Sequence, residues 1–324
     1  MEKVLITGGA GLIGSHLAER LASKGVQILI LDDFSTGSKA NIEALSSLSS
    51  VKVFSGSVLD KELVEKLMSQ VDFCFHLAAC LGVRKIIEDP IQSLKVNIHG
   101  TENVIESASK QGVPILLAST SEIYGKNPIQ PLSEDSDRLL GSPLKYRWSY
   151  SEAKALDESL VQMYGDQKGL KFIICRFFNT VGPRQTGDYG MVLPRFVQAA
   201  LKGQDLEVYG DGTQSRVFCH VKDAVEAIIS LVEEPKAFGD VFNVGGRAEI
   251  TIENLAKMVI QETKSVSKIR LVPYDQAYGT AFEETYKRVP NIEKIHNTTG
   301  WSPKLSNKEM ILDLAEHLQS NPTN

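Results

Sequence analysis

Tyr150 and Lys154 lie four residues apart in the stretch R-W-S-Y-S-E-A-K, residues 147–154. On a helix, side chains at this spacing share one face. A lysine ammonium beside a phenol stabilises the phenolate, which lets a tyrosine act as a base near neutral pH. The same spacing also arises as an ordinary pair on a helix surface, so its meaning depends on what surrounds it.

A second group of polar residues follows an apolar run. Ile115–Ala118 is predicted to be a strand, and S-T-S-E-I-Y-G (residues 119–125) comes directly after it. Ligands of parallel sheets bind at the carboxyl ends of the strands. We therefore expect this hydroxyl-rich segment to lie at a ligand site, and its presence favours a catalytic role for Tyr150 and Lys154.

A glycine-rich turn stands near the start of the chain. T-G-G-A-G-L-I-G (residues 7–14) connects the predicted strand Lys3–Ile6 to the predicted helix Leu12–Ser23. Its glycines are spaced G-x-x-G-x-x-G, which suits a tight turn, close approach of the backbone to a pyrophosphate, and close packing of helix on strand. The free N–H groups of the helix N-terminus favour the phosphates. The turn therefore predicts a dinucleotide site.

Asp32 ends the second predicted strand, Gln27–Leu31. At this place a carboxylate can accept hydrogen bonds from both ribose hydroxyls of an adenosine. A 2′-phosphate there would face the same negative charge, so NAD is favoured over NADP. An alternative is that Asp32 and Asp33 form only a polar strand end.

The elements that must position these residues alternate along the first half of the chain. The further predicted strands are Val51–Phe54, Phe73–Leu77 and Lys171–Arg176, and the further predicted helices are Lys61–Ser69, Ile91–Lys110 and Ser151–Tyr164. Such alternation implies βαβ units with right-handed crossovers. The predicted fold is α/β, a Rossmann-type doubly wound parallel sheet with a smaller mixed α/β substrate domain.

The regular alternation of strands and helices ends after about residue 179, where glycines and prolines divide the chain into shorter segments. We predict a nucleotide-binding domain over residues 1–178, to which residues 216–245 return, and a smaller domain over 179–324. The smaller domain is expected to contain the helices Pro194–Lys202, Ile252–Thr263 and Lys308–Gln319.

The composition and charge of the chain indicate which classes of binding partner it lacks. The chain has 324 residues, 42% of them hydrophobic and 23% charged, with a formal net charge of −5. This balance is typical of a globular protein and offers no basic footprint for nucleic acid or anionic lipid. No apolar run approaches the roughly 18 residues of a membrane helix. The four cysteines have no metal-like spacing. We expect a cytoplasmic protein without a metal site.

Taken together, the motifs resemble the extended short-chain dehydrogenase/reductase family, which comprises NAD-dependent nucleotide-sugar epimerases, dehydratases and decarboxylases. The resemblance covers nearly the whole chain. It rests on the glycine turn, S-T-S-E-I-Y-G, Tyr150 with Lys154, and four further landmarks: H-L-A-A (76–79), Asn97, R-F-F-N-T-V-G-P-R (176–184) and Y-G-D-G-T-Q-S-R (209–216).

The resemblance implies a reaction through a 4-keto sugar. Tyr150 removes the proton of the sugar 4-hydroxyl while a hydride passes from C4 to a tightly held NAD, and Thr120 hydrogen-bonds O4. The residues implied to bind NAD are Gly8, Gly11, Leu12, Ile13, Gly14, Asp32, Ser57, Val58, Leu77, Ala78, Ala79, Asn97, Tyr150 and Lys154. Those implied to bind the nucleotide sugar are Arg84, Asn179, Arg184, Arg195, Tyr209, Arg216 and Arg288. The family commonly forms homodimers through two helices, here near residues 97–110 and 151–164.

The choice of reaction depends on a few residues. Thr120, Ser121 and Glu122 resemble the Thr-Ser-Glu triplet of UDP-glucuronate decarboxylases, and residues 277–292 are similar to their C-terminal signature, in which Arg288 faces the active site. Oxidation at C4 makes the C5 carboxylate a β-keto acid, so Arg288 is expected to position the carboxylate. Glu122 and Ser121 are expected to handle the proton. The sequence therefore favours decarboxylation of UDP-glucuronate to UDP-xylose or its 4-keto form.

Other reactions stay open at the level of sequence. Residues 182–192 look more like those of epimerases, and residues 76–84 resemble UDP-glucuronate 4-epimerases, with Arg84 as the carboxylate partner. A 4-epimerase of a UDP-hexose or UDP-hexuronate is thus the main alternative. Ser121 argues against the glucose 4,6-dehydratases, which carry Thr-Asp-Glu, whereas GDP-mannose dehydratases share the Thr-Ser-Glu triplet. The intact set Thr120, Tyr150 and Lys154 argues against a non-catalytic NAD-binding regulator. Ser57 replaces the aspartate that the family commonly places near the adenine.

Overall fold

A computed structural model describes residues 1–80, 89–185, 191–274, 276 and 285–321. Its largest element is a seven-stranded sheet in which all the paired strands run parallel. The strands, in spatial order, are β3 (Val51–Ser55), β2 (Gln27–Asp32), β1 (Lys3–Thr7), β4 (Phe73–His76), β5 (Ile115–Thr120), β6 (Phe172–Phe177) and β11 (Asp240–Val244). The order reverses between β1 and β4, which confirms the predicted doubly wound sheet.

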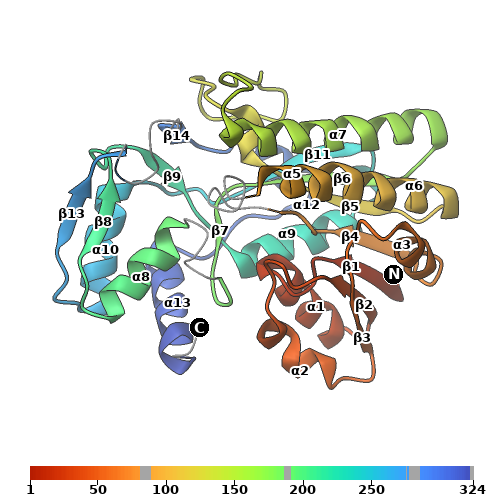
Figure 1. The fold of residues 1–324 in the computed structure, drawn as a ribbon, viewed down its shortest axis with the longest axis horizontal. Coiled ribbons are helices and arrows are strands. Elements are labelled where there is room, and N and C mark those ends of the chain that lie inside the picture. Colours follow the sequence, from red (N-terminus) through yellow and green to blue (C-terminus); the bar gives the residue numbers. More distant parts are fainter. Residues whose placement is uncertain (81–88, 186–190, 275, 277–284, 322–324) are drawn as a thin grey trace.

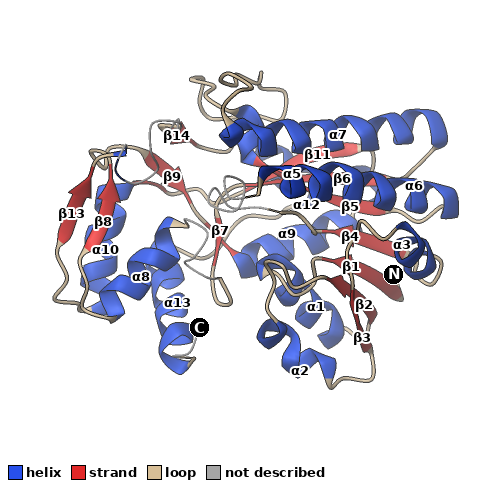
Figure 2. Ribbon diagram, viewed as in Figure 1, coloured by secondary structure: helices blue, strands red, loops and turns tan. Residues whose placement is uncertain are grey.

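Helices cover both faces of this sheet (Figure 2). One face carries α3 (Lys61–Met68), α5 (Pro90–Lys95), α6 (Thr101–Gln111) and α7 (Ser149–Lys168), and the other carries α1 (Leu12–Ser23), α2 (Glu43–Ser46), α9 (Val221–Glu233) and α12 (Glu293–Thr299). The strands are buried on both sides, so they are apolar throughout instead of alternating. Two hydrophobic clusters, one on each face, result.

A smaller group of elements lies at one end of the long axis, on the left of Figure 1. It contains the helices α8 (Val192–Leu201), α10 (Ile252–Thr263) and α13 (Asn307–Ser320), whose apolar faces form a third cluster. Its strands are β8 (Leu206–Tyr209) paired with β13 (Ile269–Val272), and β9 (Ser215–Val217) between β12 (Glu249–Thr251) and β14 (Lys287–Arg288). A short pair, β7 (Thr180–Val181) with β10 (Cys219–His220), lies where the chain passes between the two groups.

The observed elements follow the predicted ranges with a few differences. The single helix expected over Ile91–Lys110 is interrupted, because a π-helical turn at Val96–Gly100 separates α5 from α6. The helix α9 was not predicted; it begins at the cap His220 and is buried against α1. Strand β11 pairs with β6, so a segment late in the chain completes the large sheet. The domain boundary at residue 178 stays a prediction.

In the part of the chain that the structure describes, no helix is both long and apolar enough to cross a membrane. The four cysteines are all buried and carry free thiols.

Candidate active site

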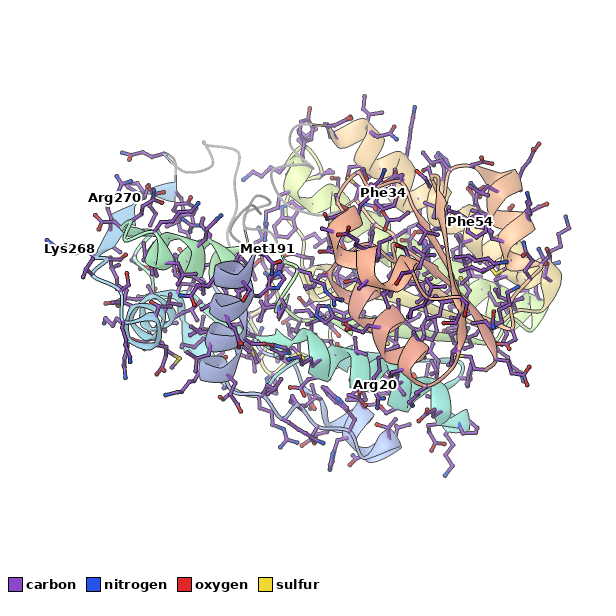
Figure 3. The ribbon with its side chains drawn as sticks, turned by 90° about the horizontal axis from the view of Figure 1, so that it is seen from below. Arg20, Phe34, Phe54, Met191, Lys268 and Arg270 are labelled. Carbon is purple, nitrogen blue, oxygen red and sulfur yellow. The ribbon has the colours of Figure 1, made fainter. Side chains whose placement is uncertain are left out.

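A cleft of about 470 Å³ runs along the carboxyl ends of the large sheet and on to the smaller group of elements. In Figure 3, Met191, which lines this cleft, lies between the part that carries Lys268 and Arg270 and the part that carries Phe34 and Phe54. The volume is in the range of small-molecule sites. The cleft is lined by most of the residues predicted for the site: Gly8, Gly11, Leu12, Ile13, Gly14, Asp32, Ser57, Val58, Leu77, Ala78, Ala79, Thr120, Ser121, Glu122, Tyr150, Asn179, Arg184, Arg195, Tyr209, Arg216 and Arg288.

Three predicted residues do not line the described cleft. Lys154 and Asn97 are buried behind it. Arg84 lies outside the described residues. The Asn97 side chain accepts a hydrogen bond from the backbone N–H of Cys80 at 2.7 Å and donates one to the carbonyl of Cys80 at 3.0 Å. Asn97 therefore fixes the backbone directly after Ala78 and Ala79. Its place on the π-helical turn brings its side chain to this backbone.

The glycine turn is shaped as a cradle. Gly8 has φ of +73°, and a Cβ at this position would lie 2.7 Å from the backbone nitrogen of Ala78. A Cβ on Gly14 would lie 2.2 Å from the carbonyl oxygen of Gly8. Neither space admits a side chain, so the backbone is open toward the cleft where α1 begins. This is the arrangement that a pyrophosphate needs, and the residues present fit NAD.

Asp32 is held at the rim of this cradle by two backbone donors. Its Oδ2 accepts a hydrogen bond from the N–H of Ala10 at 2.8 Å, and its Oδ1 accepts one from the N–H of Phe34 at 2.8 Å. Burial raises the pKa of this carboxyl group, and the two backbone bonds act in the opposite direction. The carboxylate is thus fixed beside the glycine turn, in the place where the ribose of an adenosine would lie.

Tyr150 lies in the first turn of α7 and lines the cleft together with Thr120, the last residue of β5. Its pKa is raised, first by burial and then by the negative charges of Glu122 and Asp157, whereas a hydrogen bond with Thr120 lowers it. The strand end and the helix therefore bring a phenol and a hydroxyl to one point of the cleft. A sugar hydroxyl bound there would meet both groups.

Lys154 follows one turn later and is only 1% exposed. Its Nζ donates a hydrogen bond to Oδ2 of Asp157 at 2.9 Å, and Asp157 is also 1% exposed. The lysine that the sequence pairs with Tyr150 thus has a buried carboxylate as its partner. Position 157 was not predicted to belong to the site.

A carboxylate and two arginines meet beyond Tyr150. Glu122 Oε1 accepts a hydrogen bond from Nη1 of Arg288 at 2.5 Å, and its Oε2 accepts one from Nη2 of Arg147 at 3.3 Å. Nη1 of Arg288 also lies 3.4 Å from Oγ of Ser121. Burial opposes ionisation of Glu122, but Arg147, Arg288 and Arg216 outweigh it and lower its pKa to about 2. Glu122 is therefore a carboxylate at neutral pH.

Elements distant in sequence build this cluster. Glu122 follows β5, Arg147 precedes α7 in a short 3₁₀ turn, and Arg288 lies in β14, paired with β9. The hydroxyl of Ser151 donates to the carbonyl of Glu122 at 2.8 Å and fixes the start of α7 to the strand end. Among the described residues, Nε of Arg288 is buried without a hydrogen-bond partner. It remains available to an anion in the cleft.

The remaining predicted residues lie toward the smaller group of elements. The guanidinium of Arg195, on α8, stacks over the ring of Tyr209 with 4.1 Å between Cζ and the ring centroid. Arg216, on β9, is buried and donates to the carbonyl of Ser215 at 2.8 Å. Asn179 uses its amide to bind the carbonyl of Val217. A flat, cationic surface of this kind suits a nucleoside diphosphate.

Arg184 takes a different direction from the other arginines. Its Nη2 forms an ion pair of 2.7 Å with Glu19 of α1, on the cofactor side of the cleft, and its backbone has φ of +69°. Its buried Nη1 has no hydrogen-bond partner within the described residues. Arg184 therefore lines the cleft and is also tied to α1, the helix that begins at the glycine turn.

Sequence reasoning missed two charged residues that the structure places next to the predicted ones. Arg147 stands three residues before Tyr150, and Asp157 three residues after Lys154. The first could have been found, because a helix that begins near Ser149 carries Arg147 to the same end as Tyr150. The second could have been found from helical spacing, since residues three apart share a face.

Comparison with known proteins agrees with this geometry. Residues 4–245 match the model of the NAD dependent epimerase/dehydratase family. UDP-N-acetyl-alpha-D-glucosaminuronate decarboxylase of Bacillus cytotoxicus is 44% identical over 94% of this chain and 94% of its own. UDP-glucuronic acid decarboxylase 1 of Danio rerio is 34% identical over 93% of this chain and 69% of its own.

The fold has relatives among solved structures. UDP-glucuronic acid 4-epimerase from Bacillus cereus, in complex with UDP-glucuronic acid and NAD, superposes with a TM-score of 0.88 at 26% identity, over 98% of this chain and 99% of its own. UDP-glucose 4-epimerase from Thermotoga maritima superposes with a TM-score of 0.89 at 27% identity, over 99% of each chain. The family match, the glycine cradle and Asp32 identify the cofactor as NAD. The chain is an enzyme of the NAD-dependent epimerase/dehydratase family.

Proposed function

We propose that this enzyme decarboxylates a UDP-hexuronate through a 4-keto intermediate, and that the UDP sugar lies along the cleft with its carboxylate at Arg288 and Arg147. The observation that carries the proposal is the cluster in which two arginines share the single carboxylate of Glu122, beside Tyr150. The guanidinium groups of Arg147 and Arg288 both line the cleft at this point, and a planar guanidinium suits a carboxylate as its hydrogen-bond partner.

The residues at the end of β5 and the start of α7 carry out the oxidation step. When bound, NAD would supply the oxidant that turns C4 of the sugar into a ketone, and the NADH so formed would return the hydride to C4 where the product is the UDP-pentose and not its 4-keto form. Tyr150 takes the proton of the 4-hydroxyl, Thr120 holds O4 by a hydrogen bond, and the charge of Lys154 favours the phenolate. Burial raises the pKa of Tyr150, although its side chain still lines the cleft.

The ketone at C4 makes the substrate carboxylate a β-keto acid. The bond between C5 and the carboxyl carbon then breaks, CO2 leaves, and the electron pair passes into an enolate across C4 and C5. Arg288 and Arg147 orient the carboxylate before it leaves, so that the breaking bond stays in line with the ketone. C5 finally needs a proton, for which Glu122 and Ser121 are the nearest candidates in the cluster.

The low pKa of Glu122 has a consequence for this step. A carboxyl group with a pKa of about 2 holds no proton at neutral pH. If the substrate carboxylate takes Arg288 or Arg147 as its partner, Glu122 loses part of that stabilisation and its pKa rises toward the range of a proton carrier. Binding of the substrate would therefore prepare the residue that protonates C5.

Two UDP-hexuronates should be tested first as substrates. UDP-glucuronate satisfies the cluster, and a relative that is 34% identical is named for it. UDP-N-acetylglucosaminuronate carries the same carboxylate with an acetamido group at C2, and a relative that is 44% identical is named for that substrate. The Glu122 cluster is proposed to bind the carboxylate, which both sugars carry, so both are candidate substrates of the proposed reaction.

We also propose that the enzyme acts as a homodimer through α7 and the helix expected near residues 97–110, which includes α6. Leu156 and Met163 are spaced seven residues apart on α7 and are 50% and 55% exposed. Ile91, on the neighbouring α5, is 68% exposed. Exposed apolar side chains on α7 and on the helix beside it support a helical interface. Sedimentation of the purified enzyme tests this: a dimer that becomes a monomer on Leu156→Glu supports it, and a monomeric wild type contradicts it.

The reaction is tested by incubating the purified enzyme with NAD and each UDP-hexuronate and following the sugar by proton NMR. The proposal expects a UDP-pentose, or its 4-keto form, from at least one of them. Conversion of UDP-glucuronate to UDP-galacturonate would instead establish a 4-epimerase, the activity for which the Bacillus cereus structure is named. UDP-glucose, which lacks the carboxylate, is the control substrate and should not be consumed.

A further inference from the structure

The buried side of the Tyr150–Lys154 pair contains a carboxylate that the reaction outlined above does not use. Asp157 Oδ2 accepts a hydrogen bond from Nζ of Lys154 at 2.9 Å, and both side chains are 1% exposed. The hydroxyl of Thr101, on α6, lies 3.2 Å from the same oxygen. A buried ion pair of this kind is strongly directional, because neither partner can turn to water.

The hydrogen bonds continue from Thr101 toward the glycine turn. Its Oγ1 lies 2.6 Å from the carbonyl oxygen of Asn97 and 3.0 Å from Nε2 of His76, whose Nδ1 lies 2.7 Å from Oγ1 of Thr7. Thr101 has one proton and faces two acceptors, so His76 must donate through Nε2 and accept from Thr7 through Nδ1. Burial and the charge of Lys154 lower the pKa of His76 to about 3, so it is neutral.

The charges around the pair are few. Tyr150 is exposed to the negative charges of Glu122 and Asp157 and, more weakly, to Cys80. Glu122 is compensated by Arg147 and Arg288. Asp157 also faces Glu158, whose carboxylate pairs with Arg176 at 2.7 Å. Within the part of the chain that the structure describes, Asp157 is the carboxylate that shares its counter-ion, Lys154, with the phenolate that Tyr150 would form.

From this competition we propose that Asp157 is a positioning residue that fixes Lys154 and sets the pH at which Tyr150 becomes a base. The ammonium of Lys154 can favour a phenolate fully only when no other anion neutralises it. Asp157 neutralises the ammonium of Lys154 in part. The position of Lys154 is thereby fixed, but the phenol of Tyr150 becomes less acidic than it would be beside an unpaired lysine. The raised pKa of Tyr150, to which Asp157 contributes, agrees with this relation.

The proposal rests on Tyr150 and Lys154 acting as the base pair of the family, not on decarboxylation. It therefore survives if the enzyme proves to be an epimerase, and it can fail while the decarboxylase proposal stands. Its test must also separate an electrostatic role from a purely structural one, because a buried ion pair also contributes to folding.

The test compares Asp157→Asn with wild type, and Glu152→Gln serves as the matched control. The asparagine keeps the shape and an oxygen for Lys154 but removes the charge, whereas Glu152, on the same helix, is 57% exposed and pairs with Arg138 on the surface. For each protein, phenolate absorbance is titrated with and without an added Tyr150→Phe change, and the difference isolates the ionisation of Tyr150. The rate of bound-NAD reduction at saturating substrate is measured across the same pH range.

The proposal expects Asp157→Asn to move both the phenolate titration and the rising limb of the rate profile to lower pH by about one unit, since a neighbouring charge shifts a pKa by that order. Glu152→Gln should move neither. A rate that falls at every pH with both midpoints unchanged would overturn the proposal and leave Asp157 with a structural role. If Asp157→Asn does not fold, Asp157→Ala, which leaves room for water, must show the same downward shift.

Discussion

Arg288 donates a hydrogen bond of 2.5 Å to Glu122, although 166 residues of chain separate them. Arg288 reaches the site from β14, which the short strand β9 holds in place, and Glu122 reaches it from the end of β5. The contact therefore joins the smaller group of elements to the carboxyl edge of the large sheet. It also fixes the charge pattern on which the proposed decarboxylation depends.

Removing the phenol hydroxyl should stop the reaction without emptying the cofactor site. In Tyr150→Phe we expect turnover to fall by a factor of about 100 to 10,000, the usual contribution of a general base. NAD should stay bound, because the glycine turn and Asp32 are untouched. Turnover and the nucleotide retained after gel filtration are the measurements. Tyr146→Phe, an exposed tyrosine three residues before the helix, is the control and should behave as wild type. Undiminished turnover in Tyr150→Phe would remove this residue from the mechanism.

Arg288 should matter for a substrate carboxylate far more than for the fold of the nucleotide site. Arg288→Ala is expected to lower kcat/KM for a UDP-hexuronate by about 10- to 100-fold, which corresponds to the loss of a hydrogen bond to a charged group. Affinity for UDP alone should change little. Arg247→Ala changes an exposed arginine whose Nη2 donates to Oγ of Ser302 at 3.0 Å, and it is the matched control. Full CO2 release by Arg288→Ala would show that the carboxylate binds elsewhere.

Arg147 should share this role, because it is the second cation on Glu122. Its side chain is only 6% exposed, so substitution by lysine would not restore the geometry of the guanidinium. We expect both Arg147→Lys and Arg147→Gln to raise the KM for a UDP-hexuronate. Steady-state kinetics with the two variants check this. Equal KM values for wild type and Arg147→Gln would restrict the carboxylate site to Arg288.

The ionisation of Glu122 should appear in the pH dependence of stability. Its pKa in the folded protein is about 2, below the roughly 4.3 of an unfolded chain. The carboxylate therefore stabilises the fold above pH about 4.3, and this contribution is lost as the pH falls through about 2. Its upper size is about 3 kcal/mol.

Urea unfolding of wild type and Glu122→Gln measures that contribution. The difference in the free energy of unfolding should be largest at neutral pH, where the variant removes the carboxylate that Arg147 and Arg288 share, and should shrink steadily below pH about 4. A difference that stays constant from neutral to acidic pH would mean that Glu122 is not held ionised by Arg147 and Arg288.

The cradle for NAD should tolerate no side chain at Gly14. A Cβ there would lie 2.2 Å from the carbonyl oxygen of Gly8, and backbone cannot move aside as a side chain can. We expect Gly14→Ala to lose NAD and to fall in thermal stability. A Cβ at Gly11 would lie 3.3 Å from the same oxygen, so Gly11→Ala should be milder. Calorimetric NAD binding and thermal unfolding distinguish the two, and equal behaviour would contradict this account of the turn.

Much of the fold could be read from sequence because the large sheet is parallel. Its strands are apolar throughout, and its helices are amphipathic and of ordinary length, so β1 and α1 appear where the pattern predicts them. The π-helical turn at Val96–Gly100 could not be predicted, since the residues on either side keep helical spacing. Strand β11 joins the sheet by pairing with β6, which lies far away in the sequence. No local sequence pattern indicates this pairing.

The residues of the site also divide into those that the sequence could predict and those that it could not. Residues that depend on one turn of backbone, such as Gly14 and Asp32, could be assigned from their spacing alone. For Asp157, helical spacing indicates the face that it shares with Lys154 but not its burial, because aspartate side chains are more often exposed than buried. The meeting of Glu122 with Arg147 and Arg288 depends on three segments that only the folded chain brings together.

Loss of the substrate carboxyl group is the measurement that tests the central claim most directly. UDP-glucuronate and UDP-N-acetylglucosaminuronate, isotopically labelled at the carboxyl carbon, are incubated with the enzyme and NAD, and the label is followed from sugar to CO2, with Tyr150→Phe as the blank. The cluster around Glu122 predicts that wild type releases labelled CO2 from at least one of them, at a rate that depends on Arg288. A label that remains in the sugar while C4 inverts would contradict the account.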